Sequence, residues 1–286
     1  MLIAYKRVNN FKAAIMSFYR VFTLCILVVV LRSPANAQEW MVDSVQHESG
    51  LLAIKIDALG NHYVVTEEMQ IIKYNPKGTI RNTYNNNRLG SIGRLDVSNP
   101  FLILVYYPQY QTAVLLDNNL SESGRIRFSD IGIGNIRSAA VSDDNNLWVF
   151  DEGARNIIKV STNGHILFKG IPCFNFDIDD SRPFEIMQRG GYLYICQPDL
   201  PVRIFDIYGK WVKSLLLDNF QAMIYLDKII YYKADNKIYS HNTELPMLGD
   251  TVLWEAGNVY SICYDAREIR FYGINSTGEI VKLNVR

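Results

Sequence analysis

The sequence predicts an all-β protein, a six-bladed β-propeller, from three observations. Its apolar runs are four to eight residues long and rich in Val, Ile, Tyr and Phe, as strands are. Turn signals such as Asn163-Gly164 separate the runs. The strand pattern recurs about every 41 residues, which is the size of a four-stranded propeller blade, whereas a β-sandwich imposes no such period.

The second strand of each repeat marks the period most clearly. These strands begin near His62, Leu102, Leu147, Tyr192, Ile229 and Ile269, so successive repeats lie 40, 45, 45, 37 and 40 residues apart. An apolar first strand precedes each of them, and a third strand follows. The 249 residues after position 37 divide into six repeats of about 41.5 residues, which supports a count of six blades.

Residues 1–37 have the pattern of a cleavable signal peptide, and residues 38–286 form the predicted propeller. Lys and Arg side chains precede an apolar run at 21–31, which is shorter than the roughly 20 residues of a membrane-spanning helix. Ala35-Asn36-Ala37 then supplies small residues at the right spacing, so we expect cleavage between Ala37 and Gln38. Met16 is an alternative start that would give a more ordinary signal length.

Charge excludes nucleic acid as a partner. Residues 1–37 carry five Lys or Arg and no Asp or Glu, so the chain's 29 bases fall to 24 while its 29 acids remain. The mature protein therefore has a formal charge of −5. A surface of this sign gains nothing from releasing the counterions of a phosphate backbone. After signal cleavage no apolar run is long enough to span a membrane.

The last blade needs a strand from elsewhere. The sixth repeat ends at its third strand, whereas residues 39–45, EWMVDSV, precede the first repeat and alternate as a strand does. We expect this N-terminal strand to complete the last blade and close the ring. Closure of this kind removes exposed strand edges, which invite aggregation.

The third repeat carries a family resemblance. Residues 139–167, AAVSDDNNLWVFDEGARNIIKVSTNGHIL, have an Asp-rich turn, a Val-rich strand ending in Asp, and Arg-x-Ile before a Gly turn. This repeat resembles the NHL type, while the other repeats keep only its rhythm. From about residue 40 to residue 286 the chain looks like the small exported six-bladed propellers of Bacteroidota. The resemblance implies the fold and not the function, because propellers host lyases, lactonases, receptors and scaffolds alike.

The cysteines do not form a disulfide framework. Cys25 lies in the apolar run of the signal peptide and leaves with it. Cys173, Cys196 and Cys263 remain, an odd number with no C-x-x-C spacing. We expect buried free thiols, with a single bridge as the alternative.

Catalytic motifs are missing from the sequence, and we expect no cofactor, no metal and no catalytic residues. The G-x-S-x-G elbow, the P-loop and G-x-G-x-x-G are absent. Four histidines lack metal-ligand spacing and are expected at the surface or in turns: His47, His62, His165 and His241. The last three lie on different repeats.

An enzyme would draw its groups from the innermost strands around the central channel, as lactonases resembling gluconolactonase do. The first strands offer a mixed set of polar side chains: Lys55, Asp57, Arg94, Asp96, Ser138, Glu185 and Asp265. Such acids and bases can pair with one another instead of holding a divalent metal. A metal-dependent lactonase-like hydrolase or a lyase is therefore the alternative interpretation.

Loops on one face of the disc provide the predicted binding surface. We place there the aromatic group at 106–110 and the long loop at 170–183, in which aromatic and acidic residues alternate. The residues predicted to contact a partner are Tyr107, Tyr110, Asp151, Arg155, Phe174, Phe176, Asp177 and Asp179. We expect Arg155 to pair with Asp151 or Glu152.

These observations predict an exported, non-catalytic propeller that binds or scaffolds a protein of the cell envelope. Export, a rigid disc and loops with aromatic and acidic side chains support that interpretation. We expect a periplasmic protein, or a peripheral one at the outer membrane or cell surface. On its own the chain is expected to be a monomer.

Overall fold

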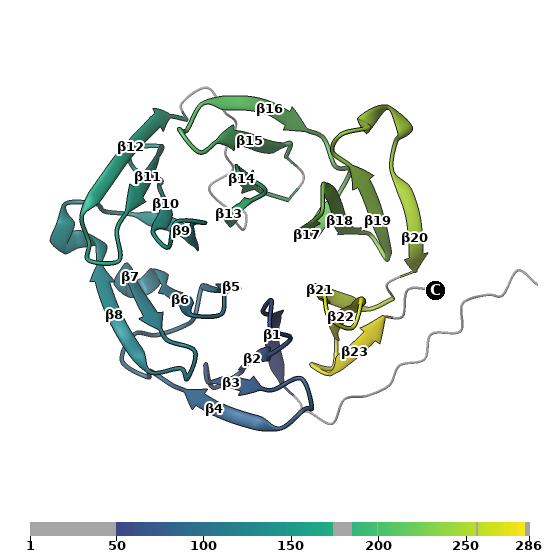
Figure 1. The fold of residues 1–286 in the computed structure, drawn as a ribbon, viewed down its shortest axis with the longest axis horizontal. Helices are drawn as coiled ribbons and strands as arrows, with labels where there is room; N and C mark the ends of the chain where they lie inside the picture. The colour runs from purple at the N-terminus through teal and green to yellow at the C-terminus, as the bar shows by residue number, and fades with distance from the viewer. Residues whose placement is uncertain (1–49, 174–184, 199, 256, 284–286) are drawn as a thin grey trace, which may run out of the picture. The chain divides into compact units, whose positions relative to one another are not determined.

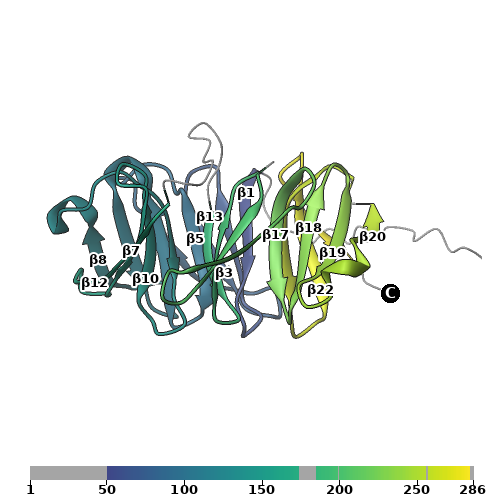
Figure 2. The same ribbon diagram turned by 90° about the horizontal axis from the view of Figure 1, so that it is seen from above.

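The protein folds as a ring of six antiparallel sheets around a central axis. The computed structural model describes residues 50–173, 185–198, 200–255 and 257–283. In this part of the chain strands dominate, and the helical elements are three short 3-10 turns. Figure 1 looks down the axis of the ring, and Figure 2 shows the blades standing side by side across a flat disc.

The strands follow one another in chain order. Blades 1 to 3 contain β1 (Leu51–Ile56), β2 (His62–Thr66), β3 (Ile71–Tyr74), β4 (Ile80–Tyr84), β5 (Arg94–Asn99), β6 (Leu102–Tyr107), β7 (Thr112–Leu116), β8 (Glu122–Arg127), β9 (Ile136–Val141), β10 (Leu147–Asp151), β11 (Asn156–Val160) and β12 (Ile166–Pro172). Blades 4 to 6 contain β13 (Glu185–Arg189), β14 (Tyr192–Cys196), β15 (Val202–Asp206), β16 (Trp211–Leu215), β17 (Phe220–Leu226), β18 (Ile229–Ala234), β19 (Lys237–Asn242), β20 (Thr251–Glu255), β21 (Val259–Asp265), β22 (Arg270–Asn275) and β23 (Ile280–Leu283). The 3-10 turns are η1 (Pro108–Tyr110), η2 (Phe128–Ile131) and η3 (Pro246–Leu248).

The predicted six-bladed propeller is confirmed. Each sheet runs as a meander with its first strand at the centre of the ring and its last at the rim (Figure 1). Five of the predicted second strands begin at the expected residue, and the sixth begins at Arg270 instead of Ile269. Blades 1 to 5 have four strands, and blade 6 has three within the described residues. The predicted signal peptide at 1–37 and closing strand at 39–45 lie outside the described residues.

Six apolar clusters hold the ring together, one between each pair of neighbouring blades. The central strands β2, β6 and β10 are almost wholly buried because a sheet covers each of their faces. Such strands read as continuous apolar runs, which explains why the second strands marked the period so clearly. The outer strands β4, β8 and β16 are largely exposed.

Blade 6 packs directly against blade 1. The Tyr260 hydroxyl donates a hydrogen bond to the backbone carbonyl of Leu51 at 2.6 Å, and Arg267 donates to the carbonyl of Leu59 at 2.6 Å. One of the six apolar clusters, which includes Ile54 and Tyr272, lies between the same two blades. The described strands therefore already bring the two ends of the ring together.

The three cysteines in the described residues are free thiols, as predicted. Cys173, Cys196 and Cys263 are buried free thiols. Two histidines do not follow the prediction, because His62 and His241 are buried and face Asp265 and Asp250. In the described part of the chain no helix is long and apolar enough to cross a bilayer.

Candidate functional site

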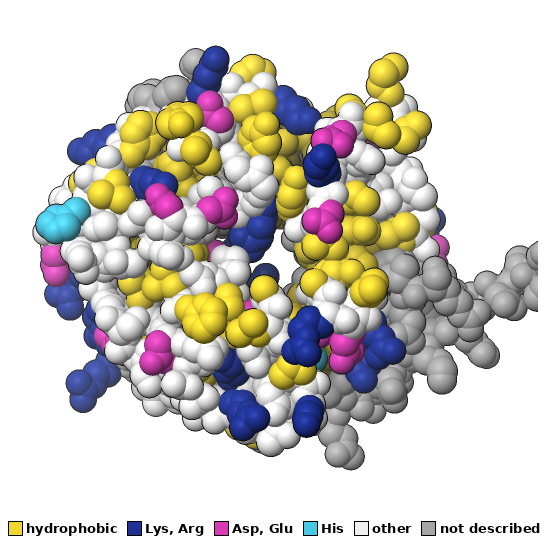
Figure 3. Space-filling model, viewed as in Figure 1, with side chains coloured by type: hydrophobic (Ala, Val, Ile, Leu, Met, Phe, Trp, Pro, Cys, Tyr) yellow, Lys and Arg dark blue, Asp and Glu magenta, His cyan; other side chains and the backbone are white. Residues whose placement is uncertain are grey.

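The first strands of the blades converge on a cavity in the centre of the ring. This cavity has a volume of about 320 Å³ and is lined by β1, β5, β13, β17 and β21 with the turns that follow them. Figure 3 shows a hollow at the middle of the disc, with Lys and Arg side chains at its edge. The volume lies at the lower end of the range for small-molecule sites.

Charged side chains form one half of the cavity wall. Arg94 of β5 forms an ion pair with Glu185 of β13, so blades 2 and 4 are tied together across the end of blade 3. Asp96 accepts hydrogen bonds from the backbone N–H groups of Ser98 at 2.9 Å and Val141 at 3.0 Å. Both carboxylates are therefore held by groups of the protein itself.

The electrostatics of these groups follow from their partners. Burial alone would raise the pKa of Glu185, but Arg94 and Lys55 outweigh burial and hold it below its usual value. Burial is likewise outweighed at Asp96, where Arg189, Arg94 and the two N–H groups lower the pKa. Burial would lower the pKa of Arg94, but the Glu185 and Asp96 carboxylates raise it. All three groups stay charged at neutral pH.

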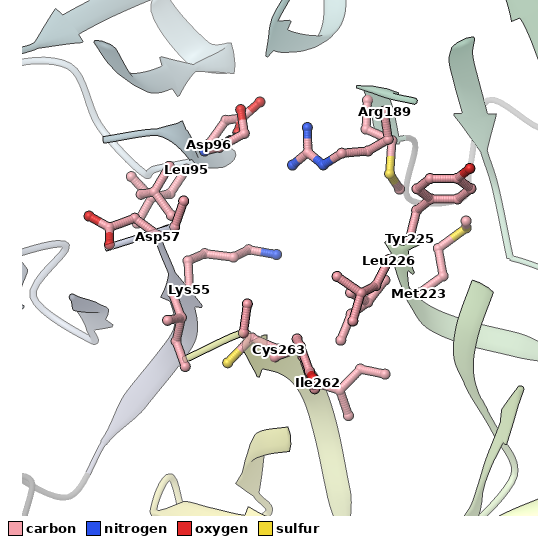
Figure 4. A pocket seen from close by; sticks show the side chains of 18 of the residues that line it. Lys55, Asp57, Leu95, Asp96, Arg189, Met223, Tyr225, Leu226, Ile262 and Cys263 are labelled. Carbon is pink, nitrogen blue, oxygen red and sulfur yellow. Dashed lines mark hydrogen bonds between the residues drawn. The ribbon is translucent and has the colours of Figure 1, made fainter. Parts of the chain in front are cut away.

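Asp57 also lines the cavity but is held by its own turn. Its Oδ1 accepts the backbone N–H groups of Leu59 and Asn61, both at 2.9 Å. Its Oδ2 accepts the Asn61 amide at 2.8 Å and the Tyr63 hydroxyl at 2.9 Å. With four hydrogen bonds, Asp57 is a structural residue of the β1–β2 turn, and its carboxylate points away from the open centre (Figure 4).

Two cations point into the open centre from opposite walls (Figure 4). Within the described residues, Lys55 has no hydrogen-bond or ion-pair partner. Arg189 donates one hydrogen bond to the backbone carbonyl of Gln188 at 2.6 Å and has no ion pair there. Arg189 was missed in the sequence analysis. Glu185, Met187 and Arg189 alternate along β13 and all line the cavity, so strand periodicity was the signal that could have found it.

The other half of the wall is apolar. Leu226 of β17 and Ile262 of β21 line the cavity between the strands that carry Arg189 and Lys55 (Figure 4). Met223 and Tyr225 of β17 also border it, but their side chains pack between blades 4 and 5. The site therefore combines two cations that have no ion pair with apolar surface on the strands between them.

Two residues predicted for the channel lie outside this cavity. Ser138 is buried and accepts the backbone N–H of Ile186 at 3.3 Å, which joins blades 3 and 4. Asp265 is buried 3.6 Å from His62, where burial lowers the pKa of the histidine more than Asp265 raises it. In the described part of the chain no three or more His, Cys, Asp or Glu residues come together as a possible metal site.

The predicted binding surface is placed only in part. Phe174, Phe176, Asp177 and Asp179 lie outside the described residues. Tyr110 is exposed in η1. Arg155 is half-buried in a turn, with left-handed backbone at φ 46°, and the predicted partner Glu152 pairs with Arg137 at 2.7 Å.

Tyr107 and Asp151 correct the prediction. The strand β6 continues through Tyr107, whose partner is Thr112, so its side chain enters the core between blades 1 and 2 and is only 1% exposed. Asp151 is buried and accepts the N–H of Ala154 at 3.1 Å. Neither side chain is available to a partner on the surface.

An apolar patch on the rim was not foreseen. In η3 and the residue before it, Leu245, Met247 and Leu248 are 55%, 99% and 74% exposed. Other exposed apolar side chains lie on the neighbouring outer strands β16 and β20 and on the residue after β16: Trp211, Val212, Leu216 and Val252. We call Leu245, Met247 and Leu248 the rim patch. Figure 3 shows apolar side chains protruding at the upper right, where Figure 1 places the turn between β19 and β20.

Polar contacts hold the rim patch in place. Lys213 of β16 donates to the backbone carbonyl of Thr243 at 3.2 Å, which joins blades 4 and 5 at the patch. Directly after η3, Asp250 accepts a hydrogen bond from the Tyr232 hydroxyl and lies 2.6 Å from Nδ1 of His241. The sequence signal for the patch was the apolar run Leu245-Pro246-Met247-Leu248, which lies in a turn where polar residues are usual.

Comparison with known proteins identifies the fold and no more. No family model matches the sequence, and no curated protein matches it. The chain is similar in structure to virginiamycin B lyase from Staphylococcus aureus, with a TM-score of 0.57 and 13% identity over 82% of this chain and 80% of that one. It is similar to the Pan2 WD40 domain of Neurospora crassa, with a TM-score of 0.56 and 10% identity over 83% and 76%. A streptogramin B lyase gives 0.55 and 12% over 84% and 94%. At such identities the likeness shows a propeller and leaves the activity open.

Proposed function

We propose that this protein is an exported, non-catalytic β-propeller that binds a protein of the cell envelope through the rim patch. The observation that carries the proposal is the exposure of Leu245, Met247 and Leu248 on a turn fixed to the body of the disc. Monomeric proteins rarely expose contiguous apolar side chains of this size unless a partner covers them. The partner is a protein that presents apolar side chains of its own.

The central cavity favours the same interpretation over a channel enzyme. Its carboxylates Asp57, Asp96 and Glu185 are occupied by hydrogen bonds or an ion pair within the protein. A carboxylate that is held in this way is a structural group, because releasing it for a metal or a proton transfer would break contacts between blades.

Export rests on the sequence of residues 1–37, with cleavage proposed between Ala37 and Gln38. A periplasmic place, or a peripheral one at the outer membrane or cell surface, follows from that proposal. We also propose that the third repeat is of the NHL type, on the basis of its sequence.

The test is capture of the partner from living cells. A tagged copy is crosslinked in the cells that produce it, the envelope fraction is recovered, and bound proteins are identified by mass spectrometry. Met247→Asp combined with Leu248→Asp should abolish capture of one stoichiometric envelope protein, because a charge in an apolar contact must be desolvated. Phe101→Asp, which changes a residue 67% exposed on blade 2, is the matched control and should capture normally.

Thermal unfolding of each variant shows that the fold is intact. Recovery of the lone monomer from wild-type cells, or equal capture by the rim variant and the control, would overturn the proposal.

A further inference from the structure

We propose that the central cavity binds a small organic anion with an apolar body, that is, a carboxylate carrying an aliphatic or aromatic group. The carboxylate would lie between Lys55 and Arg189, and the body would lie against β17 and β21. This site is separate from the rim patch and does not depend on the protein-binding function.

The first step is to ask which charged side chains of the cavity already have partners within the protein. Three acids and three bases line the cavity, but they are not equally engaged. Asp57, Asp96 and Glu185 are held by hydrogen bonds or by Arg94. Lys55 and Arg189 are the cations that remain without an ion-pair partner within 4 Å among the described residues. The cavity therefore offers cationic hydrogen-bond donors that a ligand can bind, whereas each of its carboxylates already has a partner in the protein.

The second step is orientation. Lys55 projects from β1 in blade 1 and Arg189 from the end of β13 in blade 4, and both side chains reach toward the same open space (Figure 4). Because rigid strands carry both residues, their charged groups are placed before a ligand arrives, which reduces the entropy lost on binding. Lys55 and Arg189 act on Glu185 and Asp96 only at longer range, where they help to lower the pKa of these two acids.

The third step is the apolar wall. Leu226 and Ile262 line the cavity on β17 and β21, the strands that lie between those carrying Arg189 and Lys55. An inorganic anion would leave this wall uncovered, and a neutral apolar molecule would leave the two cations without a partner. A carboxylate with an apolar body satisfies both, because its charged group pairs with the cations while its hydrocarbon is removed from water against the apolar wall.

Isothermal titration calorimetry of the purified full chain with octanoate tests the site. We expect octanoate to bind, while octanamide and octylammonium bind at least about tenfold more weakly, because a charge-assisted hydrogen bond is worth about 1.5–3 kcal/mol. Acetate, which lacks the apolar body, should show no detectable binding. Lys55→Met and Arg189→Met should each weaken octanoate binding by about tenfold or more, and Leu226→Gln should weaken it by a smaller factor.

The controls keep the test decisive. Lys77→Met removes an exposed lysine from the β3–β4 turn and should leave octanoate binding unchanged. Lys55→Arg keeps the charge and should retain binding within a few-fold of wild type. If Arg189→Met fails to fold, the two Lys55 variants still decide the question. Equal binding of octanoate and octanamide, unchanged binding by a folded Lys55→Met variant, or absence of octanoate binding would each overturn the proposal.

Discussion

Glu185 of β13 and Arg94 of β5 form an ion pair that passes over the end of blade 3 and joins two blades that are not neighbours in the ring. Sheets in a propeller are held mainly by apolar contacts with the adjacent blade, so a link of this kind adds a constraint across the channel. The pair also determines the chemistry of the cavity, because it uses one acid and one base and leaves Lys55 and Arg189 unpaired there.

Removing one partner of this pair should destabilise the fold. Arg94→Met leaves the Glu185 carboxylate without its counter-charge, and we expect a loss of about 2 kcal/mol in the free energy of unfolding. This loss is below that for a fully buried pair, because the Glu185 side chain keeps 35% exposure. The double variant Arg94→Met, Glu185→Met should recover most of the loss, since no unpaired charge remains. Urea unfolding at pH 7 measures both, and a double variant no more stable than Arg94→Met would contradict this account.

Acid should weaken the protein through the same carboxylates. The folded state holds the pKa of Asp96 and Glu185 below their usual values, whereas in the unfolded chain these groups take up protons near pH 4. Below that pH the unfolded state binds more protons than the folded state, so stability falls as pH falls and is fully present above about pH 5. Urea unfolding between pH 3 and pH 6 checks the slope. Asp96→Asn should flatten it, and an unchanged slope in that variant would show that Asp96 is not responsible.

Asp250 should hold the rim patch in place. In Asp250→Ala, the buried Tyr232 hydroxyl and His241 ring lose their partner, at a cost of about 1–3 kcal/mol in the free energy of unfolding. The η3 turn then loses its anchor, so capture of the envelope partner should fall as well. Glu244 lies on the same turn as η3 and forms an exposed ion pair with Lys228. Glu244→Ala breaks this pair and should change neither the free energy of unfolding nor the capture of the partner measurably. Normal capture by a folded Asp250→Ala variant would contradict the prediction that Asp250 holds the rim patch in its binding position.

The thiols should be unreactive in the folded protein. Burial raises the pKa of Cys173 to about 11 and that of Cys263 to about 12, and it raises the pKa of Cys196 as well. A thiol that is buried and protonated reacts slowly with disulfide reagents. Dithionitrobenzoate at pH 8 should therefore label these three residues only after unfolding, as peptide mass spectrometry can show. Rapid labelling of any of the three in the native protein would contradict their buried position.

The repeat architecture could be predicted from the sequence because it rests on a strong local signal. Central strands such as β10 are buried on both faces and form continuous apolar runs, so their starts could be placed within a residue. Tyr107 was misplaced because the aromatic group at 106–110 was assigned as a whole to a surface loop. The strand in fact continues through Tyr107 before the proline begins η1.

The candidate sites were harder to predict, since they depend on how separate blades meet. Lys55 and Asp96 were expected around the channel, but the pairing of Arg94 with Glu185 depends on the radius of the ring and the height of each strand. The repeat pattern of the sequence does not determine the radius of the ring or the height of each strand. The rim patch was missed for a related reason, because the exposure of Met247 is decided by which neighbours its turn contacts.

Site-specific photo-crosslinking tests the proposed function most directly. A photoreactive amino acid placed at Met247 or, as control, at Phe101 is activated in living cells, and adducts are resolved by mass. The account predicts one dominant adduct with an envelope protein from position 247 and none from position 101. No adduct from position 247, or the same mixture of adducts from both positions, would contradict the claim that the rim patch binds a specific partner.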